Sequence, residues 1–388
     1  MSCQDARGVV FRSDAGFVAD EAGVVDPTRH PATGPAYTAV DPYGLWWSAA
    51  PARPTDALFP AIATTVEAVA DGVVVERVEF ERRWFLDGMA REPVSDEGLV
   101  GALYLPRERP AAGVIVLGGS EGGLVSAEPA AAALAYHGLA ALALASFGLP
   151  GLPRRLADIP LEYFETALAW LAGHEAVAGR KLGVLGRSRG GELALLLGAT
   201  FSSVGAVVGI VPSGVLWGGW GTVSPVARPR PAWTHGGRPL PAVPSPGRLS
   251  VARAYARHPV ALRPLYEEAV SQASSSATIP VERTAGPILL VSGGDDQMWP
   301  SGRFAEMVTQ RLRDHGRGDD VVHLHHPAAG HLAGSLPFLP AGAAVTRHPQ
   351  GPPFVSFKLG GTRAADGRAA SESWPHIVDF LRGSLTER

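Results

Sequence analysis

Gly186-Arg187-Ser188-Arg189-Gly190 is the stretch that decides the fold of this chain. The apolar run 182–185 before it predicts a buried strand, and the run 192–197 after it predicts the start of a helix. A serine held on a sharp turn between a strand and a helix is typical of a nucleophile elbow. The glycines permit the strained backbone that presents the serine hydroxyl at the end of the strand. We therefore predict that Ser188 is a nucleophile, which a histidine can deprotonate.

The same five-residue pattern occurs again at Gly118-Gly119-Ser120-Glu121-Gly122, so the pattern alone is weak. The order of the elements that follow distinguishes the two matches. An α/β-hydrolase places its nucleophile, its acid and its histidine after successive strands, in that order. After Ser188, apolar runs predict strands that lead to an acidic pair and then to a histidine, at 206–211, 287–292 and 321–325. Starting from Ser120 leaves two surplus strands before any acid. We favour Ser188 over Ser120, with a purely structural turn as the remaining alternative.

The composition indicates a globular protein with no bias towards nucleic acid or an anionic membrane. The chain has 388 residues, 46% hydrophobic and 18% charged, and its formal net charge is −3. Cys3 is the only cysteine, which excludes an internal disulfide and favours a reducing compartment. Since neither a signal-peptide pattern nor a long apolar run is present, we expect a cytoplasmic protein. The preference for Arg over Lys suggests a bacterial source.

Two regions with different patterns divide the chain near residue 95. Short β-prone segments broken by Pro, Gly and Asp predict a small antiparallel β domain over residues 1–95, at 17–18, 24–25, 37–40, 62–69 and 73–85. Over residues 96–388, strands alternate with helices, as at 99–105, 113–117, 141–145, 161–173 and 303–313. This alternation predicts the α/β class, with a mostly parallel sheet covered by helices on both faces. Together with the elbow, it predicts an α/β-hydrolase fold.

The stretch 213–247 is rich in Pro, Gly and Trp and interrupts this alternation. Its ends emerge at the rim of the sheet, where this fold builds substrate pockets. Its tryptophans would be costly to expose, and they are Trp217, Trp220 and Trp233. We predict that the stretch folds over the Ser188 site, with Trp217 and Trp220 in the substrate pocket. Packing within the insertion is the alternative.

Several motifs in the right order resemble one known family. They are Asp41-Pro42-Tyr43-Gly44-Leu45-Trp46-Trp47-Ser48, Leu161-Glu162-Tyr163-Phe164, the elbow through Leu193, Ile279-Pro280-Val281-Glu282, Gly294-Asp295-Asp296 with Trp299, and Ala329-Gly330-His331 followed by Pro337 and Pro340. From about Asp26 onward the chain resembles the acyl-CoA thioesterases grouped with bile acid–CoA:amino acid N-acyltransferases. The resemblance implies an N-terminal β-sandwich, then a dienelactone-hydrolase-like α/β-hydrolase domain that acts on acyl thioesters through a Ser-Asp-His set.

Two features depart from that family pattern. The N-terminal region is short, so we expect a truncated β-sandwich there. The stretch 213–247 is unlike its counterpart, so the acyl specificity is not carried over. The implied partner is an acyl thioester of coenzyme A or of an acyl carrier protein, and no metal or other cofactor is required. The oligomeric state is left open.

A histidine base and its orienting acid are expected after the last two strands. His331 lies in a loop after an apolar strand, where a hydrolase places its base, and the family pattern supports it. Asp296 aligns with the second Asp of the family's Asp-Asp pair and is preferred as the acid. Asp295 is the alternative, or it caps the turn.

Backbone amides are expected to hold the oxyanion. This fold uses the amide of the residue after the nucleophile, here Arg189, and one from the loop after an earlier strand, here Gly119 or Ser120. The side chain of Arg189 is expected to face solvent, with contact to a coenzyme A phosphate as the alternative. Glu192 is interpreted as a favourable charge in the first turn of a helix.

Four histidines late in the chain raise the question of a metal site. His323, His325 and His326 could join His331, but alternation along a strand sends His325 and His326 to opposite faces. No cysteine or carboxylate has the spacing of a metal ligand beside them, so we expect no zinc.

The sequence thus predicts a serine hydrolase of acyl thioesters, and three alternatives remain. The acyl group could pass to an amine or hydroxyl, as in an acyltransferase or a cyclising or offloading enzyme of a bacterial biosynthetic pathway. The chain could be a carboxylester or dienelactone-type hydrolase, because the fold does not fix the leaving group. It could also be a binding module without activity.

Overall fold

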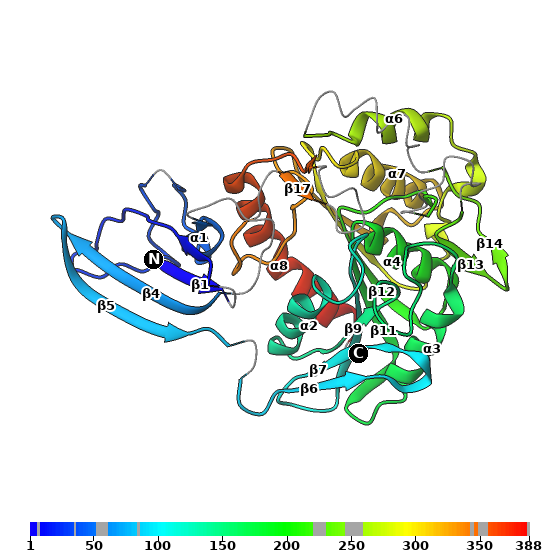
Figure 1. Cartoon of the computed structure of the whole chain (residues 1–388), viewed down its shortest axis with the longest axis horizontal. Helices are drawn as coiled ribbons and strands as arrows, with labels where there is room; N and C mark the ends of the chain where they lie inside the picture. Colours follow the sequence, from blue (N-terminus) through cyan, green and yellow to red (C-terminus); the bar gives the residue numbers. More distant parts are fainter. Residues whose placement is uncertain are drawn as a thin grey trace.

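The computed structural model describes residues 1–5, 8–34, 36–51, 61–83, 86–219, 230–244, 259–341, 345–347 and 356–385. Figure 1 shows two β-sheet regions, the N-terminal one in blue at one end and the larger one at the other. Helix α8 (Arg363–Leu385) lies between them. The expectation of an N-terminal antiparallel sheet followed by a mostly parallel sheet covered by helices is confirmed.

The N-terminal sheet is antiparallel and has the order β3-β2-β1-β4-β5. Its strands are β1 (Ser2–Asp5), β2 (Val10–Arg12), β3 (Ala50–Pro51), β4 (Ala61–Ala70) and β5 (Val73–Glu81). The turn between β4 and β5 is Asp71-Gly72, both at positive φ, which suits a tight hairpin. The strands predicted at 24–25 and 37–40 are wrong, because the structure has no strand at either place. Tyr37 instead packs its ring against Trp47.

The main sheet has eight strands in the order β16-β15-β12-β11-β8-β9-β7-β6. They are β6 (Ala90–Val94), β7 (Val100–Leu105), β8 (Ala111–Leu117), β9 (Ala140–Ala145), β11 (Val177–Arg187), β12 (Val204–Ile210), β15 (Ile288–Gly293) and β16 (Val321–His326). The strands from β16 to β9 pair in parallel, and β7 runs antiparallel to both its neighbours. Gly186 lies opposite Leu117 and Gly209, so the elbow emerges where the neighbouring strands also end.

Helices cover both faces of this sheet. One face packs against α3 (Leu161–Ala172), α4 (Arg189–Thr200) and α7 (Ser301–Asp314), with Phe164, Leu193 and Val308 in the shared core. The other packs against α2 (Ala127–Tyr136) and α8. Because residues 182–186 of β11 are buried on both faces, they are apolar without alternation, as in other parallel sheets.

Short elements complete the fold around these layers. They are α1 (Gly44–Trp47), α6 (Arg263–Ser271), β10 (Ile159–Pro160), β13 (Trp233–His235), β14 (Arg238–Pro239), β17 (Val345–Arg347), β18 (Ser356–Lys358) and the 3₁₀ turns η1 (Asp96–Gly98), η3 (Ser275–Ala277), η4 (Val281–Arg283) and η5 (Gly318–Asp320). Pairing of β13 with β10 ties the described part of the 213–247 stretch to the body of the molecule.

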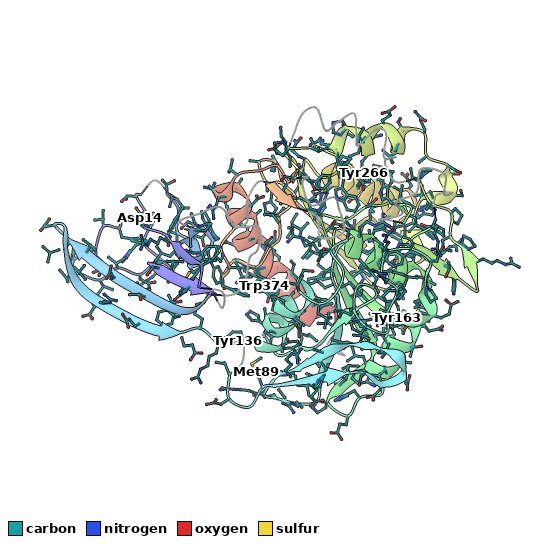
Figure 2. The ribbon with its side chains drawn as sticks, in the orientation of Figure 1. Asp14, Met89, Tyr136, Tyr163, Tyr266 and Trp374 are labelled. Atoms are coloured by element: carbon teal, nitrogen blue, oxygen red, sulfur yellow. The ribbon has the colours of Figure 1, made fainter. Side chains whose placement is uncertain are left out.

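The segment around Asp41 and Trp47 docks the N-terminal region on α8. The indole Nε1 of Trp47 donates to Asp41 Oδ2 at 2.8 Å, and Ser371 of α8 donates to Asp41 Oδ1 at 3.1 Å. A Cβ on Gly367 of α8 would lie only 2.2 Å from the Trp47 ring, so this helix position must be glycine. On the same helix, Trp374 packs near His137 at the end of α2 (Figure 2).

Candidate active site

Ser188 stands on a strained turn between β11 and α4. Its backbone angles are φ 54° and ψ −120°, a region that only a surrounding structure can enforce. A Cβ on Gly186 would lie 1.9 Å from the carbonyl oxygen of Gly190, and a Cβ on Gly190 would lie 2.2 Å from that of Gly118. Both glycines of the pentapeptide are therefore required by close backbone contact.

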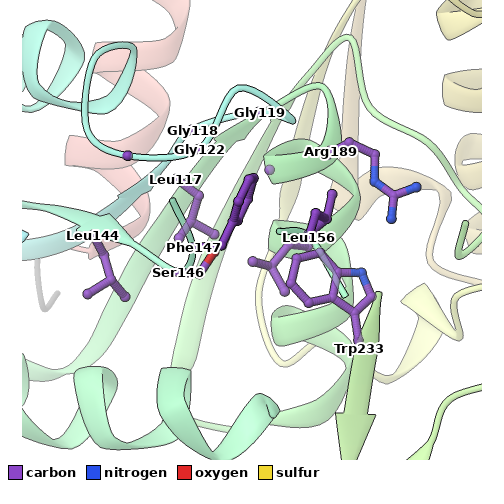
Figure 3. A pocket seen from close by; sticks show the side chains of 13 residues that line it. Leu117, Gly118, Gly119, Gly122, Leu144, Ser146, Phe147, Leu156, Arg189 and Trp233 are labelled. Atoms are coloured by element: carbon purple, nitrogen blue, oxygen red, sulfur yellow. The ribbon is translucent and has the colours of Figure 1, made fainter. Parts of the chain in front are cut away.

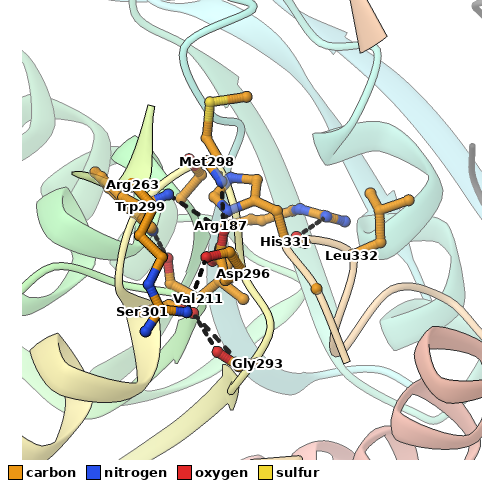
Figure 4. Close-up of polar contacts among 12 residues, drawn as sticks. Arg187, Val211, Arg263, Gly293, Asp296, Met298, Trp299, Ser301, His331 and Leu332 are labelled. Carbon is orange, nitrogen blue, oxygen red and sulfur yellow. Dashed lines mark hydrogen bonds and ion pairs between the residues drawn. The ribbon is translucent and has the colours of Figure 1, made fainter. Parts of the chain in front are cut away.

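The structure brings together the predicted nucleophile, base and acid. His331 Nε2 lies 3.0 Å from Ser188 Oγ, and His331 Nδ1 lies 2.8 Å from Asp296 Oδ2. Asp296 follows β15 and is fully buried, while His331 follows β16 and is 7% exposed (Figure 4). A buried chain from carboxylate to imidazole to hydroxyl can orient the imidazole and move a proton from the serine.

The two aspartates of the pair make different contacts. Asp296 Oδ1 accepts the amides of Met298 and Trp299, at 2.9 and 3.2 Å, which leaves Oδ2 directed at the imidazole. Asp295 instead accepts the side-chain amide of Gln297 and the backbone amide of Gly361. The geometry thus puts Asp296 beside the histidine and Asp295 in a turn.

Arg187, the residue before the serine, bonds to the loop that carries the histidine. Its Nη2 donates to the carbonyl of His331 at 2.6 Å, and its Nη1 donates to Ser335 Oγ at 2.8 Å (Figure 4). Burial lowers the pKa of this guanidinium, and the charges of Glu121, Asp366 and Asp296 oppose that effect. This role was not predicted from the sequence, because the pattern Gly-x-Ser-x-Gly leaves the residue before the serine open. The arginine at this position was the one available signal.

Asp366, at the start of α8, also bonds to the loop that carries His331. Its Oδ1 accepts the amide of Gly330 at 2.7 Å, one residue before His331. Burial raises the pKa of Asp366 to about 6, and the Gly330 amide and the Arg187 charge act against that rise.

The expectation that Arg189 faces solvent is wrong. Its side chain is 5% exposed, with Nη2 donating to the carbonyl of Trp217 at 2.9 Å and Nη1 lying 3.3 Å from Glu192 Oε2. Glu192 is fully buried and accepts the indole N–H of Trp233 at 2.9 Å. Burial raises the pKa of Glu192 to about 7, against the opposing charge of Arg189. The described part of the insertion covers the first turn of α4, which sequence periodicity alone does not reveal.

A small, narrow pocket lies beside the elbow and the loop after β8 (Figure 3). Its wall is formed by polar and apolar atoms in similar amounts, and the residues that line it are Leu117, Gly118, Gly119, Gly122, Gly123, Leu144, Ser146, Phe147, Leu156, Arg189, Gly190, Leu193 and Trp233. Trp217 is not among them, because it is fully buried between Tyr266 and Phe304. Trp220 lies outside the described residues. Among the described residues of the insertion, Trp233 is the tryptophan that lines this pocket.

The predicted oxyanion donors lie around the serine. Arg189 is the first residue of α4, where the helix leaves its amide without a partner inside the helix. Gly119 and Ser120 follow β8 in a loop against the elbow, and a Cβ on Gly119 would lie 3.4 Å from Ser188 Cβ. In this structure the amide of Gly119 donates to Glu121 Oε1 at 3.0 Å.

The four late histidines do not all converge on one point, although His323 and His325 both contact Ser292 Oγ. His325 Nδ1 contacts Ser292 Oγ at 2.9 Å, whereas His326 Nε2 contacts Ser373 Oγ of α8 at 2.8 Å, on the other face of the sheet. Strand alternation is therefore confirmed for this pair. Among the residues that the structure describes, no group of three or more His, Cys, Asp or Glu is arranged to hold a metal ion.

No helix in the described parts of the chain has both the length and the apolarity needed to cross a membrane.

Two family models match most of the chain. The model described as BAAT / Acyl-CoA thioester hydrolase C terminal matches residues 159–387, and the one for the Acyl-CoA thioester hydrolase/BAAT N-terminal region matches residues 1–96. The chain belongs to the acyl-CoA thioester hydrolase/BAAT family. It is an enzyme of the thioesterase and acyltransferase type, as the resemblance predicted.

Characterised family members are similar along almost the whole chain. A peroxisomal succinyl-coenzyme A thioesterase of Mus musculus is 31% identical over 97% of this chain and 87% of its own length. Acyl-coenzyme A thioesterase 1 of Homo sapiens is 30% identical, over 99% and 89%. Acyl-coenzyme A amino acid N-acyltransferase 1 of Mus musculus is 30% identical, over 99% and 90%.

Among solved structures, the match to a putative dienelactone hydrolase from Klebsiella pneumoniae covers 76% of the present chain and 97% of the hydrolase. Its TM-score is 0.45 and its sequence identity 14%.

Proposed function

We propose that this enzyme hydrolyses acyl thioesters through Ser188, His331 and Asp296. The observation that carries the proposal is the continuous contact from Asp296 through His331 to Ser188, at 2.8 and 3.0 Å, in a member of a thioester hydrolase family. The positive φ of Ser188 supports it, because strain of this kind gathers at functional sites.

The residues would act in two half-reactions. His331 Nε2 takes the proton of Ser188 Oγ as the oxygen attacks the thioester carbonyl carbon, and Asp296 stabilises the imidazolium that forms. The amide of Arg189 and one from the loop after β8, at Gly119 or Ser120, hold the oxyanion. Collapse of the tetrahedral intermediate breaks the C–S bond, and the thiolate leaves with the proton from His331. Water, deprotonated by His331, then attacks the acyl-enzyme and releases the free acid.

Coenzyme A is the proposed thiol of the substrate. The relatives above are thioesterases and an acyltransferase that are named for acyl-coenzyme A, and they are similar over nearly all of the chain. An acyl carrier protein is the alternative donor, and comparison of matched acyl-CoA and acyl-carrier substrates separates the two.

Acyl transfer to an amine is the second candidate. The similarity to an amino acid N-acyltransferase favours it, at the same identity and coverage as the thioesterases. The family's transferases typically carry Cys at the elbow, so Ser188 favours water as the acceptor. Analysis of the products formed with and without added glycine or taurine distinguishes the two. An amide as the main product would indicate acyl transfer, and free acid in every case would indicate hydrolysis.

The direct test is release of thiol from a panel of acyl-CoAs. We expect turnover by the wild type and a loss of roughly four orders of magnitude or more for Ser188→Ala, as in other serine hydrolases that lose a member of the set. Ser271→Ala, which removes a hydroxyl from an exposed position of α6, is the matched control. Full activity of Ser188→Ala would rule out this mechanism. Much faster turnover of p-nitrophenyl esters than of matched thioesters would favour an ester hydrolase instead.

A further inference from the structure

The carboxylate of Glu121 is bonded within the loop that lies beside the nucleophile. Its Oε1 accepts the amide of Gly119 at 3.0 Å and also the hydroxyl of Ser126. Its Oε2 lies 2.6 Å from the point where a Cβ on Gly119 would stand, and that same point is 3.4 Å from Ser188 Cβ. One of the predicted oxyanion donors is therefore already bonded to an anion of the chain itself.

A carboxylate in this position opposes the proposed chemistry. Attack by Ser188 develops negative charge on the carbonyl oxygen, and an amide stabilises that charge only when its N–H is directed at it. The N–H of Gly119 cannot be directed at the oxyanion while it bonds to Glu121. Two negative charges also repel each other, so a carboxylate bonded to this amide disfavours an oxyanion at the same place. In the arrangement seen in the structure, the amide of Gly119 therefore does not contribute to the oxyanion site.

The surroundings of Glu121 offer its carboxylate a second place. The two residues after it, Gly122 and Gly123, have φ of +73° and +65°, which glycine adopts at no steric cost. Arg187 supplies the opposite charge. Burial lowers the pKa of its guanidinium, and of the carboxylates that act against this fall, Glu121 has the largest effect. Ser126 is at the start of α2 and can follow a small movement of the carboxylate with its hydroxyl.

We propose that Glu121 caps the oxyanion site in the resting enzyme. Its carboxylate holds the Gly119 amide until a substrate carbonyl enters, and it then turns towards Arg187. The proposal rests on the function proposed above, because it requires attack by Ser188. The capped fraction lowers the observed rate in proportion, since only the uncapped enzyme can stabilise the oxyanion.

Reaction with a fluorophosphonate tests the cap without knowledge of the acyl group. The probe phosphonylates a serine nucleophile through a transition state that also needs the oxyanion donors. For Glu121→Ala, we expect the second-order rate constant to rise roughly threefold to tenfold, the reciprocal of an uncapped fraction of about a third to a tenth. Glu121→Gln loses the charge but keeps an acceptor oxygen, so a smaller rise is expected. Glu165→Gln, on the exposed face of α3, is the control for the loss of one charge and should leave the rate unchanged.

Added acetate supplies a second readout that a purely structural role of Glu121 would not give. With the side-chain carboxylate removed, acetate can occupy the Gly119 amide, so it should slow labelling of Glu121→Ala at concentrations that leave the wild type unaffected. An unchanged or slower rate for Glu121→Ala, or equal sensitivity to acetate, would overturn the cap. If Glu121→Ala does not fold, the rate of Glu121→Gln decides by the same criterion. Wild type that does not react at Ser188 would instead remove the proposed function, and the cap with it.

Discussion

The guanidinium of Arg187 donates a hydrogen bond to the backbone carbonyl of His331 across 2.6 Å. This contact joins the residue that precedes the proposed nucleophile to the residue proposed as its base. The second bond of Arg187, to Ser335, fixes the same loop four residues further on. The separation of Ser188 and His331 therefore depends on an arginine that reaches neither the hydroxyl nor the imidazole.

Substitution of Arg187 should lower turnover while leaving substrate affinity nearly unchanged. Arg187→Met removes both bonds, and a misplacement of the histidine by about 1 Å can reduce the rate on the order of a hundredfold. Arg187→Lys keeps the charge but cannot make both bonds, so an intermediate kcat is expected. Lys181→Met, at an exposed position of the same strand, is the control. A rise in KM at constant kcat would contradict a positioning role.

Separate substitution of the two neighbouring aspartates by asparagine should distinguish their roles. Asp296→Asn is expected to reduce kcat on the order of 10⁴-fold, because the amide favours the wrong imidazole tautomer and does not stabilise the imidazolium. Asp295→Asn leaves the contact to His331 intact and should retain most of the activity. Equal losses for both variants, measured as kcat for thioester hydrolysis, would argue against Asp296 as the orienting acid.

Two tryptophans of the 213–247 stretch should respond differently to removal. Trp233 lines the pocket, so Trp233→Ala should shift the preference among acyl chain lengths by ~1–3 kcal/mol in kcat/KM. Trp217 is buried in a separate cluster, so Trp217→Ala should destabilise the protein by about 3–5 kcal/mol and leave the ranking of substrates unchanged. Denaturant unfolding and an acyl-CoA panel measure the two effects. A changed ranking for Trp217→Ala alone would reverse the assignment.

Stability should fall as pH rises through the titration range of Glu192. Its pKa is about 7 in the folded protein against 4.5 for an ordinary glutamate, so the folded state binds the additional proton between these two values. A raised pKa means that the stability contribution is complete below about pH 4.5 and is lost by about pH 7, a difference of about 3 kcal/mol. Glu192→Gln should remove this part of the pH dependence, whereas Glu268→Gln, on an exposed position of α6, should not. Equal slopes for wild type and Glu192→Gln between pH 5 and pH 8 would contradict the shifted pKa.

The sequence was sufficient for the features that local chemistry decides. The elbow has a required backbone shape, and the glycines and apolar runs around Ser188 reveal it without any tertiary contact. The parallel strands are also visible, since burial on both faces leaves continuous apolar runs. The order of strands also predicted the loops after β15 and β16 that carry Asp296 and His331.

Features decided by tertiary contacts were not predictable. Strand β6 reads Ala-Arg-Glu-Pro-Val, and its polar residues suit the edge of a sheet, so its apolar signal is weak. The burial of Arg189 follows from Trp217 and Trp233, which reach α4 from distant positions in the sequence. The contact of Glu121 with Gly119 spans two residues, yet nothing in its residue types distinguishes it from an exposed turn.

Helix α8 has a consequence for the order in which the enzyme can assemble during synthesis. Its Gly367 packs against the Trp47 ring, and its Asp366 accepts the amide of Gly330, the residue before His331. Every strand of both sheets leaves the ribosome before this helix does. The nascent chain must therefore keep the Trp47 surface uncovered, and the histidine loop unsupported, until α8 emerges. A chaperone that shields Trp47 over that interval would protect a residue whose partner in α8 is among the last parts of the chain to be made.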